Sequence, residues 1–227
     1  MILDDRKTRI LQAIVEEYVN NAEPIASRAV ADKYNLSLSS ATVRNEMANL
    51  EEMGYLEQPH TSSGRIPSDK GYRYYVDEIM DIDELYETEI NKVKARLQES
   101  AIDNLLRNVS EMISNLTHYT SVMIDRNNNE VRLYGRNNVF DYPEFNTIDN
   151  LRKFMYLIEE EDFVRKIIGL NEDEKIKVRI GSENIYDEIK EYTLITCDYN
   201  NMGTIGIIGP RRMDYKKVIS YLKYIIN

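Results

Sequence analysis

The sequence has very little cysteine and histidine. Cys197 is the single cysteine among 227 residues, so no disulfide can form within the chain. With only two histidines, the chain also lacks the usual ligands of a structural zinc site. Cys197 lies in the apolar run TLITCDY, where a thiol serves as a small core residue. We therefore expect neither a metal nor a cofactor.

Long apolar runs are also missing. No stretch approaches the roughly 20 apolar residues of a membrane-spanning helix. The N-terminal sequence MILDDRKTRI has no apolar segment of the kind found in signal peptides. We therefore expect a cytoplasmic protein. Its 227 residues suffice for two modest domains.

The local motifs of common enzymes are absent as well. The sequence contains no HExxH, GxSxG or P-loop pattern, and neither His60 nor His118 lies in a nucleophile or metal motif. Gly203, Gly206 and Gly209 are spaced three apart, but they lead into a proline and not into a helix that could bind a pyrophosphate. We interpret them as turns and bulges. The sequence does not predict an enzyme.

The sequence has fewer basic than acidic residues. The chain has 29 basic and 39 acidic residues, and its net charge of -10 opposes nonspecific binding to nucleic acid. Nucleic-acid binding would therefore need a local cluster of cations, with the carboxylates turned away from the duplex. The candidates for this cluster are Arg28, Arg44, Arg65, Lys70 and Arg73.

Apolar spacing and capping residues predict three helices near the N-terminus. Their expected ranges are 5–21, 27–34 and 39–53. Ser27 is the expected cap of the second helix and Ser39 or Ser40 that of the third. Three helices with a short turn before the last one are typical of a helix-turn-helix.

The third of these helices has two different faces. Val43, Met47 and Leu50 form an apolar stripe that must face a core. The other face combines small residues, which let the backbone approach a ligand, with side chains whose donors and acceptors match base edges in a major groove. These residues are Ala41, Thr42, Arg44, Asn45, Ala48 and Asn49. A solvated face of an ordinary helix is the alternative.

A hairpin is expected directly after the third helix. Residues 55–58 can pair with 65–67 across a loop of small polar residues. Such a loop can contact phosphates or place Arg65 in a minor groove. The alternative is an ordinary exposed hairpin. With the three helices before it, the hairpin predicts a winged helix over residues 1–80, with DNA-binding candidates Ser27, Arg28, Ser39, Ser40, Ala41, Thr42, Arg44, Asn45, Asn49, His60, Thr61, Ser62, Arg65, Lys70 and Arg73.

The rest of the chain predicts a helical connector and an α+β domain. Apolar residues keep near-helical spacing over 81–117, either as a dimer seam or as a helix lying on its own domain. From residue 118 to 227 strands are expected at SVMI, VRLY, IKVRI, TLIT and TIGII, and helices at 147–169, 182–192 and 214–226.

Two regions of the chain also resemble a known family. Residues 24–80, with the run SSATVRNEMANLEEMGYLEQPHTSSGRIPSDKGYR, closely resemble the N-terminal domain of the bacterial heat-inducible transcription repressors of the HrcA type. RIGSENIYDEIKEYTLITCDYN and GTIGIIGPRRMDYKKVISYL resemble the last part of the same family. The resemblance implies a homodimeric repressor of chaperone genes that binds an inverted-repeat operator, depends on the chaperonin, and has a GAF-like C-terminal domain.

The chain departs from this family in its middle. Members usually carry an inserted dimerising segment, whereas residues 125–130 form only a short polar connection. The sequence therefore does not decide whether the usual dimer contact is present or whether the GAF-like sheet is complete. Two other functions also stay open: a ligand-gated regulator with the α+β domain as a small-molecule sensor, and a protein-interaction module whose helix-turn-helix no longer touches DNA.

Overall fold

The computed structural model describes residues 2–34, 38–61, 63–81, 105–169, 175–199 and 202–226. The chain divides into two compact units, Met1–Met80 and Asp81–Asn227. Among the helices of the described residues, none has the length and apolarity needed to cross a membrane.

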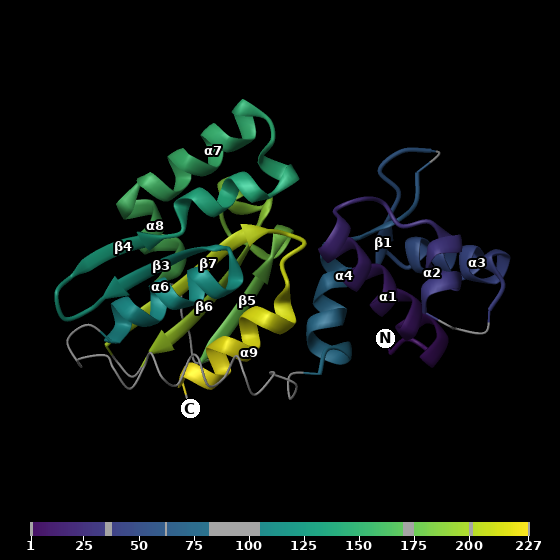
Figure 1. Cartoon of the computed structure of the whole chain (residues 1–227), viewed down its shortest axis with the longest axis horizontal. Coiled ribbons are helices and arrows are strands. Elements are labelled where there is room, and N and C mark those ends of the chain that lie inside the picture. Colours follow the sequence, from purple (N-terminus) through teal and green to yellow (C-terminus); the bar gives the residue numbers. More distant parts are fainter. Residues whose placement is uncertain are drawn as a thin grey trace. The chain divides into compact units, whose positions relative to one another are not determined.

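The first unit contains the predicted three helices and hairpin (Figure 1). Its elements are α1 (Asp5–Asn21), α2 (Ser27–Lys33), α3 (Ser40–Glu52), β1 (Leu56–Glu57), β2 (Ile66–Pro67), α4 (Asp69–Tyr74) and the π-helical turn η1 (Tyr75–Ile79). Ile14 of α1, Val30 of α2 and Leu50 of α3 are fully buried and belong to the core. The predicted winged helix-turn-helix is therefore confirmed.

Side-chain caps fix where three of these helices begin, and the Asp4 carboxylate caps α1 by accepting the Lys7 N–H. The Oγ of Ser39 accepts a hydrogen bond from the Thr42 N–H at 3.1 Å, as the sequence predicts for α3. Ser68 caps α4 in the same way. The predicted cap Ser27 is wrong, because the extended residue before α2 is Ala26 and Ser27 is already helical.

The base of the hairpin is tied to the segment that precedes α2. Ile25 and Arg65 exchange two backbone hydrogen bonds of 2.9 Å each. Gly64 makes this approach possible, because a Cβ at this position would lie 2.3 Å from the Ile25 carbonyl oxygen. The wing is thus attached to the helical part through its own backbone as well as through β1 and β2.

The second unit is built on one antiparallel sheet of strand order β4-β3-β7-β6-β5. The strands are β3 (Thr120–Asp125), β4 (Glu130–Tyr134), β5 (Ile176–Ile180), β6 (Tyr192–Tyr199) and β7 (Gly203–Pro210). Each contains one of the five predicted apolar runs. The short turn between β3 and β4 is closed by the Asp125 carboxylate, which accepts the N–H groups of Asn127 and Asn128.

Helices cover both faces of this sheet (Figure 1). Alternate residues of the central strands, such as Val122 and Ile208, join the apolar cluster formed by α7 (Ile148–Glu159) and α8 (Glu161–Ile168). The opposite face packs against α6 (Leu105–Thr117) and α9 (Tyr215–Ile226). The domain is α+β, as predicted. Residues 105–117 of the predicted connector form α6, which lies on its own domain. The other part of the predicted connector, residues 82–104, lies outside the described residues.

Two helix predictions for this unit differ from the structure. The helix predicted at 182–192 is wrong: two short 3-10 turns, η5 (Gly181–Glu183) and η6 (Asp187–Ile189), stand there. The buried side-chain amide of Asn184 donates to the carbonyls of Gly181, Ile189 and Tyr192. These hydrogen bonds fold the segment back on itself and prevent a continuous helix. The helix predicted at 147–169 divides at Glu160 into α7 and α8.

The three spaced glycines are regular residues of β7, so their interpretation as turns and bulges is wrong. Gly203, Gly206 and Gly209 all occupy paired positions in the ladder between β6 and β7. Their missing side chains leave space that neighbours fill. A Cβ on Gly206, for example, would lie 2.7 Å from the Cδ1 of Ile168 in α8.

Candidate nucleic-acid interface

The outer face of α3 is open to solvent. Val43, Met47 and Leu50 are buried, as the periodicity predicts. Arg44 and Asn45 are both exposed, and Arg44 forms no ion pair with any described residue. The exposed residues of α3 and its cap are Ser39, Ser40, Ala41, Arg44, Asn45, Asn49 and Glu52, and Thr42 is half-buried. This face can therefore enter a groove without unfolding any part of the core.

One carboxylate of α3 is turned away from this face. Glu46 pairs with Arg6 and Lys7 of α1, with N–O distances of 3.2 Å to each. Hydrogen bonds to Asp4 and to Glu46 raise the pKa of Lys7. The negative charge of Glu46 is thus compensated on the α1 side of the helix, which removes part of the repulsion that DNA would meet.

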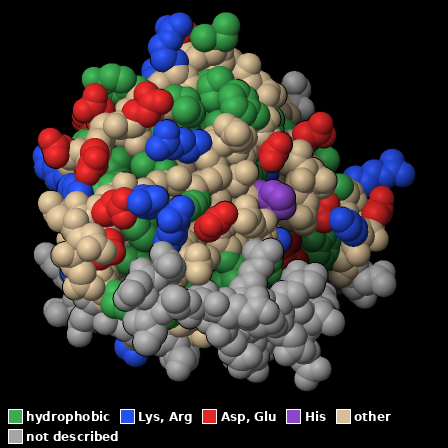
Figure 2. Space-filling model, turned by 60° about the vertical axis from the view of Figure 1, so that its left-hand side comes forward, with side chains coloured by type: hydrophobic (Ala, Val, Ile, Leu, Met, Phe, Trp, Pro, Cys, Tyr) green, Lys and Arg blue, Asp and Glu red, His purple; other side chains and the backbone are tan. Residues whose placement is uncertain are grey.

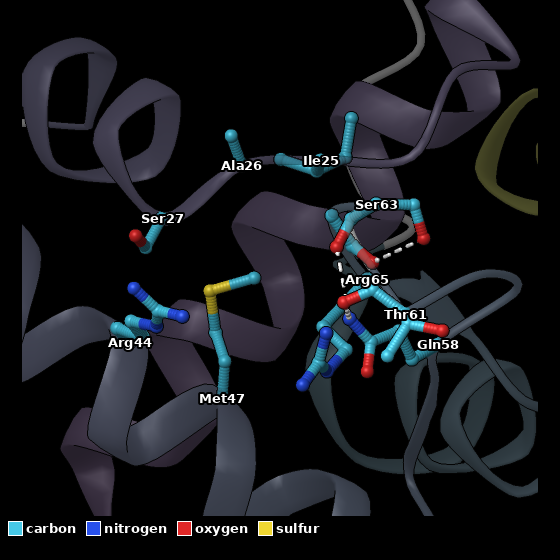
Figure 3. A pocket seen from close by; sticks show the side chains of 10 residues that line it. Ile25, Ala26, Ser27, Arg44, Met47, Gln58, Thr61, Ser63 and Arg65 are labelled. Carbon is cyan, nitrogen blue, oxygen red and sulfur yellow. Dashed lines mark hydrogen bonds between the residues drawn. The ribbon is translucent and has the colours of Figure 1, made fainter.

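A groove of about 260 Å³ lies between the start of α2, α3 and the wing. Ser27 and Arg44 are seen on one side of Met47, and Gln58, Thr61 and Arg65 on the other (Figure 3). Four of the predicted site residues, Ser27, Arg44, Thr61 and Arg65, are therefore brought to one place. Three separate segments supply them, so the groove exists only in the folded unit.

The wing loop is held in shape by its own side chains. The amide of Gln58 donates to the carbonyls of Thr61 and Ser63. The Oγ of Ser63 accepts the N–H of His60 at 3.1 Å and donates to the His60 carbonyl at 2.7 Å. His60 and Thr61 remain exposed at the tip, whereas the predicted Ser62 lies outside the described residues.

Arg65 contacts α3. Its Nε donates to the Oε2 of Glu51 at 2.8 Å, and the side chains of Arg65 and Glu51 are 19% and 33% exposed. Arg65 therefore lies at the base of the wing, between β2 and α3. Glu51 was not among the predicted site residues, because the two residues are 14 positions apart and only the fold brings them together.

The other predicted cations are not among the residues that line the groove, and they have partners within the unit. Arg28 is exposed and lies 3.6 Å from Asp32. Lys70 donates to the carbonyl of Met53, and Arg73 pairs with Asp77. Gln58 and Ser63, by contrast, line the groove but were missed. Their signal was present as polar residues at the ends of a predicted hairpin loop.

Charges on the face shown in Figure 2 are mixed. Basic and acidic side chains alternate there, and no extended area of a single sign is visible. This distribution agrees with the net charge of -10 of the whole chain. No group of three or more His, Cys, Asp or Glu side chains in the described ranges is arranged to hold a metal ion.

A winged helix-turn-helix with an open polar recognition face defines a class, the DNA-binding transcription regulators. The family profile "Winged helix-turn-helix transcription repressor, HrcA DNA-binding" matches residues 2–81, and the profile "HrcA protein C terminal domain" matches residues 82–219. The chain belongs to the HrcA family of heat-inducible transcription repressors.

Curated members of the HrcA family align with the chain over nearly its whole length. The heat-inducible transcription repressors HrcA of Ruminiclostridium cellulolyticum and Acetivibrio thermocellus are 33% and 34% identical to it. The alignments cover 100% and 99% of this chain and 96% and 94% of those proteins. The first alignment runs over 335 positions, so that relative carries residues with no counterpart among the 227 of this chain.

A solved structure shares the fold. A crystal structure described only as a hypothetical protein superposes with a TM-score of 0.76 and 19% identity, covering 100% of this chain and 97% of that one.

Proposed function

We propose that this protein represses transcription by docking α3 in the major groove of an operator, with the wing beside it. The observation that carries the proposal is the exposed α3 face, which ends at a groove shared with the wing. Arg44, Asn45 and Asn49 supply donors and acceptors that fit base edges. Membership of the HrcA family supports repression of heat-shock genes as the biological role.

Local contacts, and not net charge, account for binding in this proposal. A molecule of charge -10 is repelled by DNA at long range, so nonspecific sites bind weakly. At the operator, short-range hydrogen bonds from α3 and the wing offset this repulsion. The salt dependence of operator binding should therefore reflect only a few phosphate contacts.

The operator is an inverted repeat bound by a homodimer. This part of the proposal rests on the family resemblance, since an inverted repeat requires two recognition helices related by a two-fold axis. Selection of bound duplexes from a random pool tests it. A symmetric consensus of two half-sites is expected, and a single unrepeated half-site would contradict the dimer.

The α+β unit would then serve as the heat-sensitive part. Its five-stranded antiparallel sheet, covered by helices on both faces, supports the GAF-like assignment. We propose that only its folded form holds two DNA-binding units in register, and that the chaperonin maintains that form. Operator affinity should fall together with the thermal unfolding of this unit. Loss of affinity well below the melting transition would contradict this mechanism.

A further inference from the structure

The side chain of Arg65 is held in place before any DNA binds. Its backbone is fixed by the two hydrogen bonds to Ile25, and its Nε is held by Glu51 of α3. Because the backbone pairing does not involve Glu51, the carboxylate acts on the side chain alone. Glu51 can therefore set the direction of the guanidinium without setting the position of the wing.

The position of Arg65 decides which part of DNA it can reach. An arginine that enters a minor groove has to extend outward from the protein surface. Arg65 instead lies at the base of the wing, is 19% exposed and lines the groove beside α3. Only the Nε of its guanidinium is bound to Glu51, and the remaining N–H donors have no partner among the described residues.

We propose that the groove between α3 and the wing seats one backbone phosphate of each operator half-site, and that Glu51 positions Arg65 to bind it. This inference rests on the proposed function. The hydroxyls of Ser27 and Thr61 line the same groove and are further donors for the phosphate oxygens. Arg44, on the other side of Met47, remains free to reach bases (Figure 3).

The pairing with Glu51 gives Arg65 a particular electrostatic behaviour. The carboxylate cancels the long-range charge of the guanidinium but leaves its outer donors available at short range. A phosphate in the correct register is therefore bound, while DNA in other registers is not attracted. Removing Glu51 should weaken operator binding and strengthen nonspecific binding, since Arg65 would become mobile and uncompensated.

The matched variants Glu51→Ala and Glu52→Ala test the role of Glu51. Both remove one carboxylate from neighbouring positions of α3, and only Glu51 contacts Arg65. Each variant is titrated against the selected duplex and against a scrambled duplex of equal length. We expect Glu51→Ala to lose about tenfold in affinity for the selected duplex and to bind the scrambled one as well or better. Glu52→Ala should slightly raise the affinity for the selected duplex and for the scrambled duplex, because it removes one negative charge.

One outcome would exclude the positioning role of Glu51, and another would exclude operator recognition itself. If Glu51→Ala strengthens binding to the selected duplex and to the scrambled duplex, as Glu52→Ala is expected to do, Glu51 acts only through its charge. The positioning role would then be excluded. If the wild-type protein does not distinguish the selected duplex from the scrambled one, the proposed function itself fails. Thermal melting of both variants shows whether a loss of affinity comes from unfolding.

Single methylphosphonates in the selected duplex test the phosphate seat. Each one neutralises one backbone phosphate. We expect one position per half-site at which the replacement costs the wild-type protein about tenfold in affinity, but costs the Arg65→Ala variant much less, since only the contacts from Ser27 and Thr61 remain there. An Arg65→Ala variant that keeps the wild-type sensitivity at every phosphate would overturn the assignment.

Discussion

Two helices of similar length show how differently the two units use their residues. α3 has 13 residues and buries three side chains, whereas α9 has 12 residues and is largely enclosed. The buried residues of α9 include Tyr215, Val218, Ile219, Tyr221, Leu222 and Ile225. α9 thus contributes mainly to stability. α3 is stabilised by a narrow apolar stripe and keeps most of its surface free for a ligand. Substitutions in α9 should therefore affect folding, and substitutions on the outer face of α3 should affect binding.

The largest effect is expected in α9. Leu222 is fully buried, so Leu222→Ala should lower the free energy of unfolding by about 2–5 kcal/mol through lost burial and the cavity left behind. Urea denaturation measures this change. Lys223→Ala, at the exposed neighbouring position, is the control and should have little effect. Equal losses in the two variants would mean that α9 is not a core helix.

The reverse pattern is expected for Arg44. Arg44→Ala should weaken operator binding by about 1–3 kcal/mol if the guanidinium makes a bidentate base contact, with almost no change in unfolding free energy. Arg152→Ala removes the same charge from an exposed position of α7 and serves as the control. Fluorescence anisotropy with the selected duplex measures both. Unchanged affinity in Arg44→Ala would remove this residue from the interface.

A smaller effect is expected at the start of α3. Ser39→Ala removes the acceptor of the Thr42 N–H and should lower the free energy of unfolding by about 0.5–2 kcal/mol. Ser40→Ala is the neighbouring control, because Ser40 is the first residue inside the helix. Thermal melting monitored by circular dichroism compares the two. The cap assignment fails if Ser40→Ala is the more damaging change.

The smallest effect concerns Cys197. Burial raises the pKa of this thiol from its ordinary value of 9.0 to about 12, so it stays protonated at pH 8. Iodoacetamide should leave the native protein unmodified and should react after unfolding in urea. Because the folded pKa is the higher one, this contribution to stability is complete below pH 9 and is lost as the pH rises towards 12. Rapid modification of native protein would show that β6 is open to solvent.

Local signals predicted α3 and its exposed face from the sequence. The Ser39 cap, the spacing of Val43, Met47 and Leu50, and Gly54 at the end are all contained within one short segment. The segment 182–192 was mispredicted because its structure depends on one buried side chain, Asn184, bonded to three carbonyls. Helical propensity carries no information about such a contact.

The groove was predicted only in part for the same kind of reason. Residues with suitable chemistry, such as Arg44 and Arg65, could be named from the sequence. Their arrangement could not be predicted from the sequence. Glu51 and Arg65 are 14 positions apart, and Ile25, which pairs with Arg65 at the base of the hairpin, belongs to the segment before α2. Pairings between such distant residues follow from packing, which no local pattern reveals.

In the proposed complex, the outer face of α3 lies in the major groove of the operator. Attaching an iron chelate to an Asn45→Cys variant tests this directly, since the buried Cys197 should not react. We expect DNA cleavage at two symmetric sites, each centred in the major groove of one half-site. Stable operator binding without cleavage near either half-site would contradict this placement.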